Sequence, residues 1–137
     1  MIVDTSVIVA ILAREPERRD FVAALSGRAA VRIAGGSWVE LATVLVRRFG
    51  VADPLPVLAR LRDEFSLAIV ATTVEQAHLG IIGYARYGKG AGHRARLNFG
   101  DCFTYALAKA TGEPLLFKGD DFNHTDLTLS PAAAYPR

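Results

Sequence analysis

Short apolar runs alternate along the chain with longer segments that are apolar on one side only. Runs of three to five apolar residues rich in Val, Ile and Leu are typical of buried strands, whereas the longer segments repeat their apolar positions at helical spacing. The predicted strands cover residues 1–3, 30–34, 68–71, 115–117 and 127–129. The predicted helices cover about residues 7–13, 17–25, 37–49, 53–65, 73–87 and 98–111.

Local signals mark several helix ends. Asp53 precedes Pro54, which is the order expected for an N-cap and the first helical residue, and Gly50 ends the preceding helix. The segments 37–40 (SWVE) and 73–76 (TVEQ) have the spacing of capping boxes. Strands that alternate with helices predict an α/β domain with a central, mostly parallel sheet of 4–5 short strands.

Composition adds limits to this picture. The 137 residues are 51% hydrophobic and 22% charged, with no linker or repeat, so we expect one globular domain over residues 1–137. Asp4 interrupts the apolar start, and no run approaches the ~20 apolar residues of a membrane helix. With a single cysteine, Cys102, no internal disulfide is possible. We therefore expect a cytoplasmic protein with no membrane partner.

The net charge of +2 excludes a histone-like polycation and an acidic tail, and by itself does not predict nucleic-acid binding. The placement of the acids is more informative. Five of them follow predicted strands or open the helices beside them, where ligands bind in an open parallel sheet. These are Asp4, Glu40, Asp101, Asp120 and Asp121.

Each of these acids also has a structural interpretation. Asp4 suits a helix cap, Glu40 the third position of a capping box, and Asp101 a first helical turn. Asp120 and Asp121 are common turn residues. Their joint occurrence at equivalent ends of successive units is what favours a shared site, because clustered carboxylates repel one another unless a cation such as Mg²⁺ binds between them.

Four segments resemble the PIN-domain ribonucleases, and most closely the VapC-type toxins of bacterial toxin–antitoxin pairs. They occur in the family's order along the whole chain: residues 1–6 (MIVDTS), 37–41 (SWVEL), 97–102 (LNFGDC) and 115–122 (LLFKGDDF). The resemblance implies a PIN-like three-layer α/β/α domain. It also implies a metal-dependent endoribonuclease with Mg²⁺ as cofactor, or Mn²⁺ in its place.

Carried over by position, Asp4 and Asp101 are the implied metal ligands and Glu40 completes an acidic triad. A fourth acid falls at Asp120 or Asp121, and we favour Asp120. The resemblance gives Thr5, Ser6 and Asn98 the task of positioning substrate or ligands. In the implied mechanism the metal lowers the pKa of a bound water for in-line attack on the phosphate, and Glu40 orients or deprotonates that water.

A basic, glycine-rich loop precedes Asn98, and we expect it to grip RNA phosphates together with a lysine further along the chain, although a solvated loop explains it as well. Its residues and that lysine are Lys89, His93, Arg94, Arg96 and Lys118. Residues 83–90 (GYARYGKG) nearly match a phosphate-binding P-loop, but the final Ser or Thr is missing and the segment follows a helix.

Two other functions stay open. The fold without catalysis would make an inert module that binds RNA or a partner, which the complete acid set disfavours. A Mg²⁺-dependent phosphohydrolase needs a second Asp two residues after Asp4, where this chain has Ser6. The resemblance further implies a VapB-type antitoxin as partner, and a homodimer or a heterotetramer or octamer with it. The amphipathic segments 17–25 and 53–65 are candidate interface helices.

Overall fold

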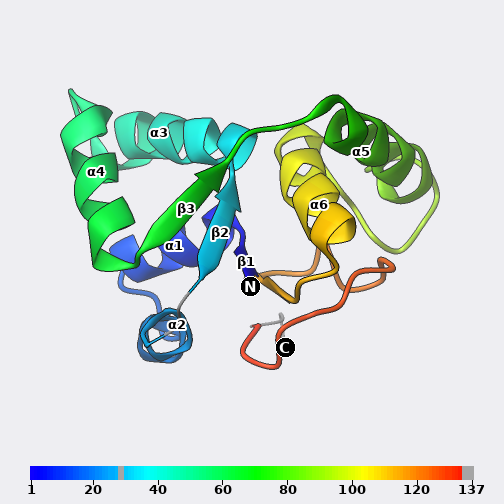
Figure 1. Cartoon of the computed structure of the whole chain (residues 1–137). Helices are drawn as coiled ribbons and strands as arrows, with labels where there is room; N and C mark the ends of the chain where they lie inside the picture. Colours follow the sequence, from blue (N-terminus) through cyan, green and yellow to red (C-terminus); the bar gives the residue numbers. More distant parts are fainter. Residues whose placement is uncertain (28–29, 134–137) are drawn as a thin grey trace.

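A parallel sheet forms the centre of the computed structural model, which describes residues 1–27 and 30–133 (Figure 1). Its strand order is β3-β2-β1-β4, and every neighbouring pair runs parallel. The strands are β1 (Ile2–Val3), β2 (Val31–Ala34), β3 (Leu67–Val70) and β4 (Leu115–Leu116). This confirms the predicted α/β class, since parallel neighbours require helical crossovers between them.

Helices cover both faces of the sheet, as the three-layer expectation requires (Figure 1). They are α1 (Thr5–Leu12), α2 (Arg18–Leu25), α3 (Gly35–Phe49), α4 (Pro54–Glu64), α5 (Val74–Tyr87) and α6 (Phe99–Thr111). Val3 and Ile33 pack with α1 to α4, whereas their strand neighbours Ile2 and Ala34 pack with α5 and α6. The period-2 alternation of the strands thus divides the core into two halves.

Several helix ends lie where the local signals place them. Gly50 adopts φ 66° after α3, and Asp53 caps α4 by accepting from the Leu55 amide at 3.2 Å. Thr73 caps α5 through the Gln76 amide at 3.1 Å. The predicted strand at 127–129 is wrong: it is reduced to a single bridge between Leu115 and Leu129.

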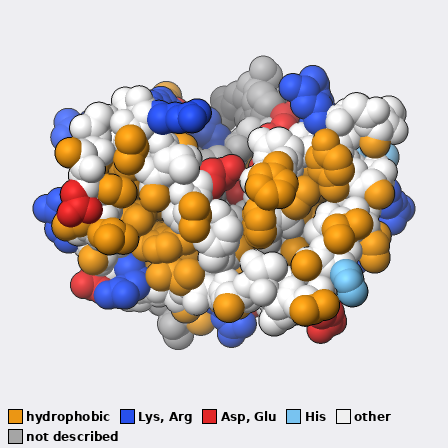
Figure 2. Space-filling view, turned by 90° about the horizontal axis from the view of Figure 1, so that it is seen from above, with side chains coloured by type: hydrophobic (Ala, Val, Ile, Leu, Met, Phe, Trp, Pro, Cys, Tyr) orange, Lys and Arg blue, Asp and Glu red, His pale blue; other side chains and the backbone are white. Residues whose placement is uncertain are grey.

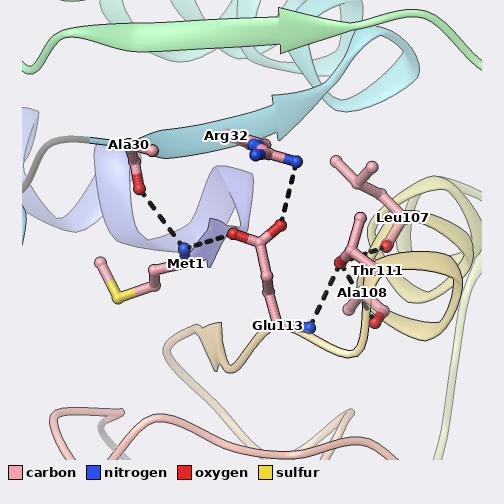
Figure 3. Close-up of polar contacts among 7 residues, drawn as sticks. All are labelled: Met1, Ala30, Arg32, Leu107, Ala108, Thr111 and Glu113. Atoms are coloured by element: carbon pink, nitrogen blue, oxygen red, sulfur yellow. Dashed lines mark hydrogen bonds and ion pairs between the residues drawn. The ribbon is translucent and has the colours of Figure 1, made fainter.

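The start of β1 is fixed to the segment between α6 and β4 (Figure 3). The Met1 amino group is buried and lies 2.8 Å from Glu113 Oε1, while Arg32 Nη1 lies 3.3 Å from Oε2 of the same carboxylate. These contacts set the position of the strand whose other end carries Asp4.

No helix in residues 1–27 and 30–133 combines the length and the apolar character that crossing a bilayer requires.

Candidate active site

Four acidic side chains lie toward the edge of the sheet where the strands end. Asp4 follows β1, Glu40 lies on α3, Asp101 lies in the first turn of α6, and Asp121 follows β4. Burial, followed by the negative charge of Asp4, raises the pKa of each of the other three, so their carboxylates interact electrostatically with Asp4. Within the described ranges no ion pair joins any of the four to Lys, Arg or His.

Asp4 is buried and is hydrogen-bonded through both carboxylate oxygens. Its Oδ2 accepts from the Ser6 amide at 3.0 Å, which makes Asp4 the N-cap of α1. Its Oδ1 accepts from the Thr104 hydroxyl at 2.7 Å. The capping interpretation is therefore correct, and it coexists with the placement of Asp4 among the other acids.

Asp101 opens α6 in a reciprocal capping box with Asn98. The Asn98 amide donates to Asp101 Oδ2, and the Asp101 amide donates to Asn98 Oδ1, both at 2.9 Å. Burial, followed by the charge of Asp4, raises the pKa of Asp101 to about 8. A cation bound beside Asp101 would oppose this shift, because it favours the ionised carboxylate.

Glu40 occupies space that only a glycine leaves open. A Cβ at Gly100 would overlap Glu40 Oε2 and lie 2.7 Å from Cδ, so the Glu40 carboxylate rests against the residue before Asp101. Burial and the charge of Asp4 raise the pKa of Glu40, and a hydrogen bond from Thr5 opposes that shift.

The expected capping box at residues 37–40 is wrong. Helix α3 begins at Gly35, after Ala34 as N-cap, and the cap makes no side-chain hydrogen bond. Ser37 lies inside the first turn, where its hydroxyl faces Thr104 Oγ1 at 2.9 Å and its carbonyl accepts from Thr5 Oγ1 at 3.1 Å. The sequence signal misplaced the start because both glycines before Ser37 adopt helical geometry.

The acid doublet after β4 divides into two roles. Asp120 is exposed, and its Oδ1 accepts from Asn123 Nδ2 at 2.9 Å, as in an ordinary turn. Asp121 is half-buried, and burial followed by the charge of Asp4 raises its pKa. The preference for Asp120 therefore needs correction, because Asp121 is the member of the doublet whose charge also acts on Asp101.

The polar residues assigned to substrate positioning contact protein groups. Asn98 caps α6, and Ser6 Oγ accepts from the Lys118 amide at 3.0 Å, which holds the segment after β4 against α1. The Thr5 hydroxyl donates to the Ser37 carbonyl at 3.1 Å, and its interaction with Glu40 opposes the rise in the pKa of that carboxyl. Their contact with substrate remains a prediction.

Sequence reasoning missed two residues of the site, Ser37 and Thr104. Both are fully buried and polar, and they lie three residues from an acid on the same helix. Ser37 precedes Glu40 by three and Thr104 follows Asp101 by three, so each shares a helix face with its acid. A search for small polar residues at that spacing would have found both.

The basic loop between α5 and α6 lies beside the acids through part of its length. Lys89 and Arg96 are close enough to Asp121 to lower its pKa, and the Arg96 amide donates to the Asp121 carbonyl at 3.4 Å. Arg94 is exposed, and His93 Nδ1 accepts from the amide of Ala95 at 3.0 Å.

The predicted phosphate-binding residue Lys118 is engaged elsewhere. Its ammonium is paired with Glu15 and with Glu17, the latter at 3.0 Å. These partners hold the lysine against the segment between α1 and α2.

An apolar groove borders the site. It has a volume of about 660 Å³ and lies between α5 and α6, where Gly80, Phe103 and Ala106 are among its walls. Exposed apolar side chains lie along it, including Ile81, Tyr84 and Phe99, the last 78% exposed. Figure 2 shows acidic side chains near the middle of this face, bordered by hydrophobic ones. An apolar surface of this kind is typical of a protein–protein contact.

The donor set suits a hard divalent cation that keeps part of its water shell. Among the described residues no group of three or more His, Cys, Asp or Glu is arranged to hold a metal by itself. Mg²⁺ commonly uses one or two protein carboxylates with water and substrate phosphate as its other ligands, so this arrangement fits that mode. Carboxylates that raise each other's pKa are those that a bound cation stabilises.

Comparison with known proteins gives consistent matches. Residues 1–127 match the model of the PIN domain family. The chain is 43% identical over 127 residues to the ribonuclease VapC42 of Mycobacterium tuberculosis, covering 93% of this chain and 96% of that one. It is also 43% identical over 127 residues to a ribonuclease VapC of Mycolicibacterium smegmatis, covering 93% and 97%.

Solved structures share the fold. The crystal structure of Mycobacterium tuberculosis VapC20, described as a sarcin-ricin loop cleaving toxin, superposes with a TM-score of 0.73 at 17% identity, covering 94% of this chain and 97% of that one. A toxin–antitoxin complex from Klebsiella pneumoniae gives a TM-score of 0.67 at 17% identity, covering 95% and 96%.

Proposed function

The chain belongs to the PIN-domain family, among the VapC-type ribonucleases, and we propose that it is a Mg²⁺-dependent endoribonuclease acting as the toxin of a VapBC-type pair in the cytoplasm. The observation that carries the metal dependence is the set of four carboxylates at one sheet edge, three of which have pKa values raised by burial and, next, by the charge of Asp4. Such a set is costly to the fold unless a cation binds there.

Asp4 and Asp101 would hold the metal, with Asp121 as the fourth acid of the site. Bound there, Mg²⁺ would polarise the scissile phosphate and lower the pKa of a water ligand; Mn²⁺ would supply the same chemistry. The protein's part is to keep the carboxylates in place: the Ser6 amide and the Thr104 hydroxyl fix Asp4, and the Asn98 amide fixes Asp101.

Glu40 would orient the attacking water and accept its proton. Its half-buried carboxylate has a raised pKa, which brings the proton affinity of the group closer to neutral pH and so suits a general base. Its place against Gly100, next to Asp101, supports this role, because a metal held by Asp101 would bring its water near the Glu40 carboxylate.

The loop cations Lys89 and Arg96 would bind the RNA backbone beside the acids. Their effect on the pKa of Asp121 supports this placement, because a phosphate near the metal would also be near these two side chains. Such contacts position a strand without reading its sequence.

The apolar groove and the toxin–antitoxin complexes of the same fold support two protein partners, an antitoxin and a second copy of this chain. A VapB-type antitoxin would hold the toxin inactive, as the toxin–antitoxin complexes of the same fold suggest. The apolar groove and the exposed side chains of α5 support a homodimer contact, onto which an antitoxin would build a heterotetramer or octamer. Ile81→Asp should then lower the mass measured by sedimentation velocity from dimer to monomer, and an unchanged mass would contradict this contact.

Cleavage of structured RNA by antitoxin-free protein tests the proposed activity. A stem–loop such as the sarcin-ricin loop and a transfer RNA are suitable substrates, each incubated with Mg²⁺ or with EDTA. Wild type should cut only with Mg²⁺, and Asp101→Asn should be slower by about 100-fold or more, since it removes a charged metal ligand. Equal cutting by the two proteins, or cutting in EDTA, would contradict the metal-carboxylate mechanism. RNA binding without cutting would instead identify an inert binding module.

A further inference from the structure

Asp4 is held by a hydroxyl that lies a hundred positions away in the sequence. Thr104, in the second turn of α6, donates to Asp4 Oδ1 at 2.7 Å, and both residues are buried. The distance is the usual one for a strong hydrogen bond from a hydroxyl donor. The other oxygen of Asp4 is bound locally by the Ser6 amide, so Thr104 provides the tertiary contact that orients the carboxylate.

A second hydroxyl fixes the direction in which Thr104 donates. Ser37 Oγ lies 2.9 Å from Thr104 Oγ1, and Ser37 is fully buried. A hydroxyl has one proton, and an ionised carboxylate can only accept. Because the Thr104 hydroxyl donates its proton to Asp4, Ser37 must be the donor in the bond between Ser37 and Thr104. The chain of bonds therefore runs from Ser37 through Thr104 to Asp4.

This chain joins the three elements that carry the acidic triad. Asp4 follows β1, Thr104 shares a helix face with Asp101 on α6, and Ser37 shares one with Glu40 on α3. Each acid of the triad is therefore either a member of the chain or three residues from one. A shift of either helix would change the geometry at Asp4.

We propose that Thr104 is a positioning residue that orients Asp4 for metal binding, and that Ser37 supports it by fixing the direction of its hydrogen bond. The proposal rests on the proposed metal-dependent function and adds to it a ligand-orienting pair that sequence motifs do not mark. Groups that orient a ligating carboxylate typically change metal affinity by about 10- to 100-fold when removed.

Direct Mn²⁺ binding tests the proposal without relying on cleavage. The free Mn²⁺ signal in electron paramagnetic resonance is titrated with wild type, Thr104→Val and Thr104→Ser, after circular dichroism shows that each variant is folded. Thr104→Val has the same shape without the hydroxyl, and we expect about 10-fold or greater loss of Mn²⁺ affinity. Thr104→Ser keeps the donor and should restore most of it.

Thr111→Val is the matched control, since it makes the same chemical change in the last turn of α6, where the hydroxyl bonds to the Leu107 carbonyl at 2.9 Å. It should bind Mn²⁺ as wild type does. Wild-type affinity in a folded Thr104→Val, or a loss in Thr104→Ser equal to that in Thr104→Val, would overturn the proposal.

A double variant tests the direction of the chain. Ser37→Ala alone should weaken Mn²⁺ binding less than Thr104→Val, because Thr104 can still donate to Asp4. Adding Ser37→Ala to Thr104→Val should cause little further loss, since the path from Ser37 to Asp4 is already broken. Fully additive losses would contradict the chain. If wild type binds Mn²⁺ but cuts no RNA, the proposed activity fails while these comparisons still decide the role of Thr104.

Discussion

The two ends of β1 hold carboxylates in opposite electrostatic surroundings. At its start, Glu113 lies 2.8 Å from the buried Met1 ammonium and near Arg32, and the hydrogen bond from that ammonium lowers the pKa of Glu113 (Figure 3). At its end, burial and then the charge of Asp4 raise the pKa of Asp101, and no ion pair joins either carboxylate to a cation among the described residues.

A second paired acid shows that the contrast is not peculiar to Glu113. Asp126 accepts from Lys109 Nζ at 2.8 Å and from the Tyr105 hydroxyl at 2.9 Å, and hydrogen bonds from these two groups lower its pKa. Carboxylates away from the site thus stabilise the fold through cations of the chain itself. Those at the strand ends have no such ion-pair partner in the described part of the chain, and three of them have raised pKa values. We therefore expect their ionised forms to lower the stability of the metal-free protein, as is common where function uses an external cation.

Among the variants that compare the unpaired acids of the site with the paired acids elsewhere, Gly100→Ala should have the largest effect. Gly100→Ala would push the Glu40 carboxylate away from Asp101 while suiting a helix, so cleavage should fall by about 10-fold or more with the fold intact. Rates of RNA cleavage at saturating Mg²⁺ measure this. Gly35→Ala is the control, because a Cβ there meets only the Val70 carbonyl at 3.4 Å and should leave the rate unchanged. Equal rates for Gly100→Ala and wild type would show that the position of Glu40 does not matter.

At the start of β1, where Glu113 is paired with the Met1 ammonium, a substitution should lower the stability of the protein and leave its activity unchanged. Glu113→Gln leaves the Met1 ammonium buried without its counter-charge, so unfolding in urea near pH 7 should require about 2 kcal/mol less. Because the pKa of Glu113 is lowered in the folded state, its contribution is complete above the unfolded pKa near 4.5 and is lost as the pH falls through the folded value. The two proteins should therefore become equally stable at low pH. A constant difference at all pH values would contradict the ion pair.

The smallest effect should come from the loop cations. Arg96→Gln should weaken RNA binding by a few-fold and reduce the slope of log affinity against log salt concentration by about one, as expected for one lost phosphate contact. Fluorescence anisotropy with labelled RNA in EDTA measures binding without cleavage. Lys118→Gln is the matched control, since its ammonium is already paired with Glu15 and Glu17. A larger loss in Lys118→Gln than in Arg96→Gln would reverse the assignment.

Local chemistry made most of the fold predictable. Asp53, Thr73 and Asn98 cap their helices through their own side chains, and such signals need no knowledge of the rest of the chain. The acids of the site could be predicted by the same logic, because the carboxyl ends of parallel strands all lie at one edge of the sheet. Asp4, Glu40 and Asp101 were proposed in this way, and their role in catalysis stays a prediction.

Features that depend on tertiary contacts were not predictable. The hydroxyl of Ser37 turned out to face Thr104 on another helix, and the choice between Asp120 and Asp121 depends on the turn after Gly119, which adopts φ 108°. The expected interface segments 17–25 and 53–65 direct several of their apolar side chains into the core, whereas α5 carries the exposed apolar face. Amphipathic periodicity identifies an apolar stripe but not the surface that covers it.

Thermal unfolding of metal-free wild type and Asp101→Asn, at pH 5 and pH 9, tests most directly the claim that the strand-end carboxylates need a divalent cation. The pKa of Asp101 is raised to about 8, so folded wild type binds more protons than the unfolded chain between about pH 4 and 8 and loses stability as the pH rises through that window. At pH 9 we expect Asp101→Asn to melt at a higher temperature than wild type, and Mg²⁺ to raise the Tm of wild type more than that of the variant. Equal Tm values for the two proteins at pH 9, unchanged by Mg²⁺, would contradict the account.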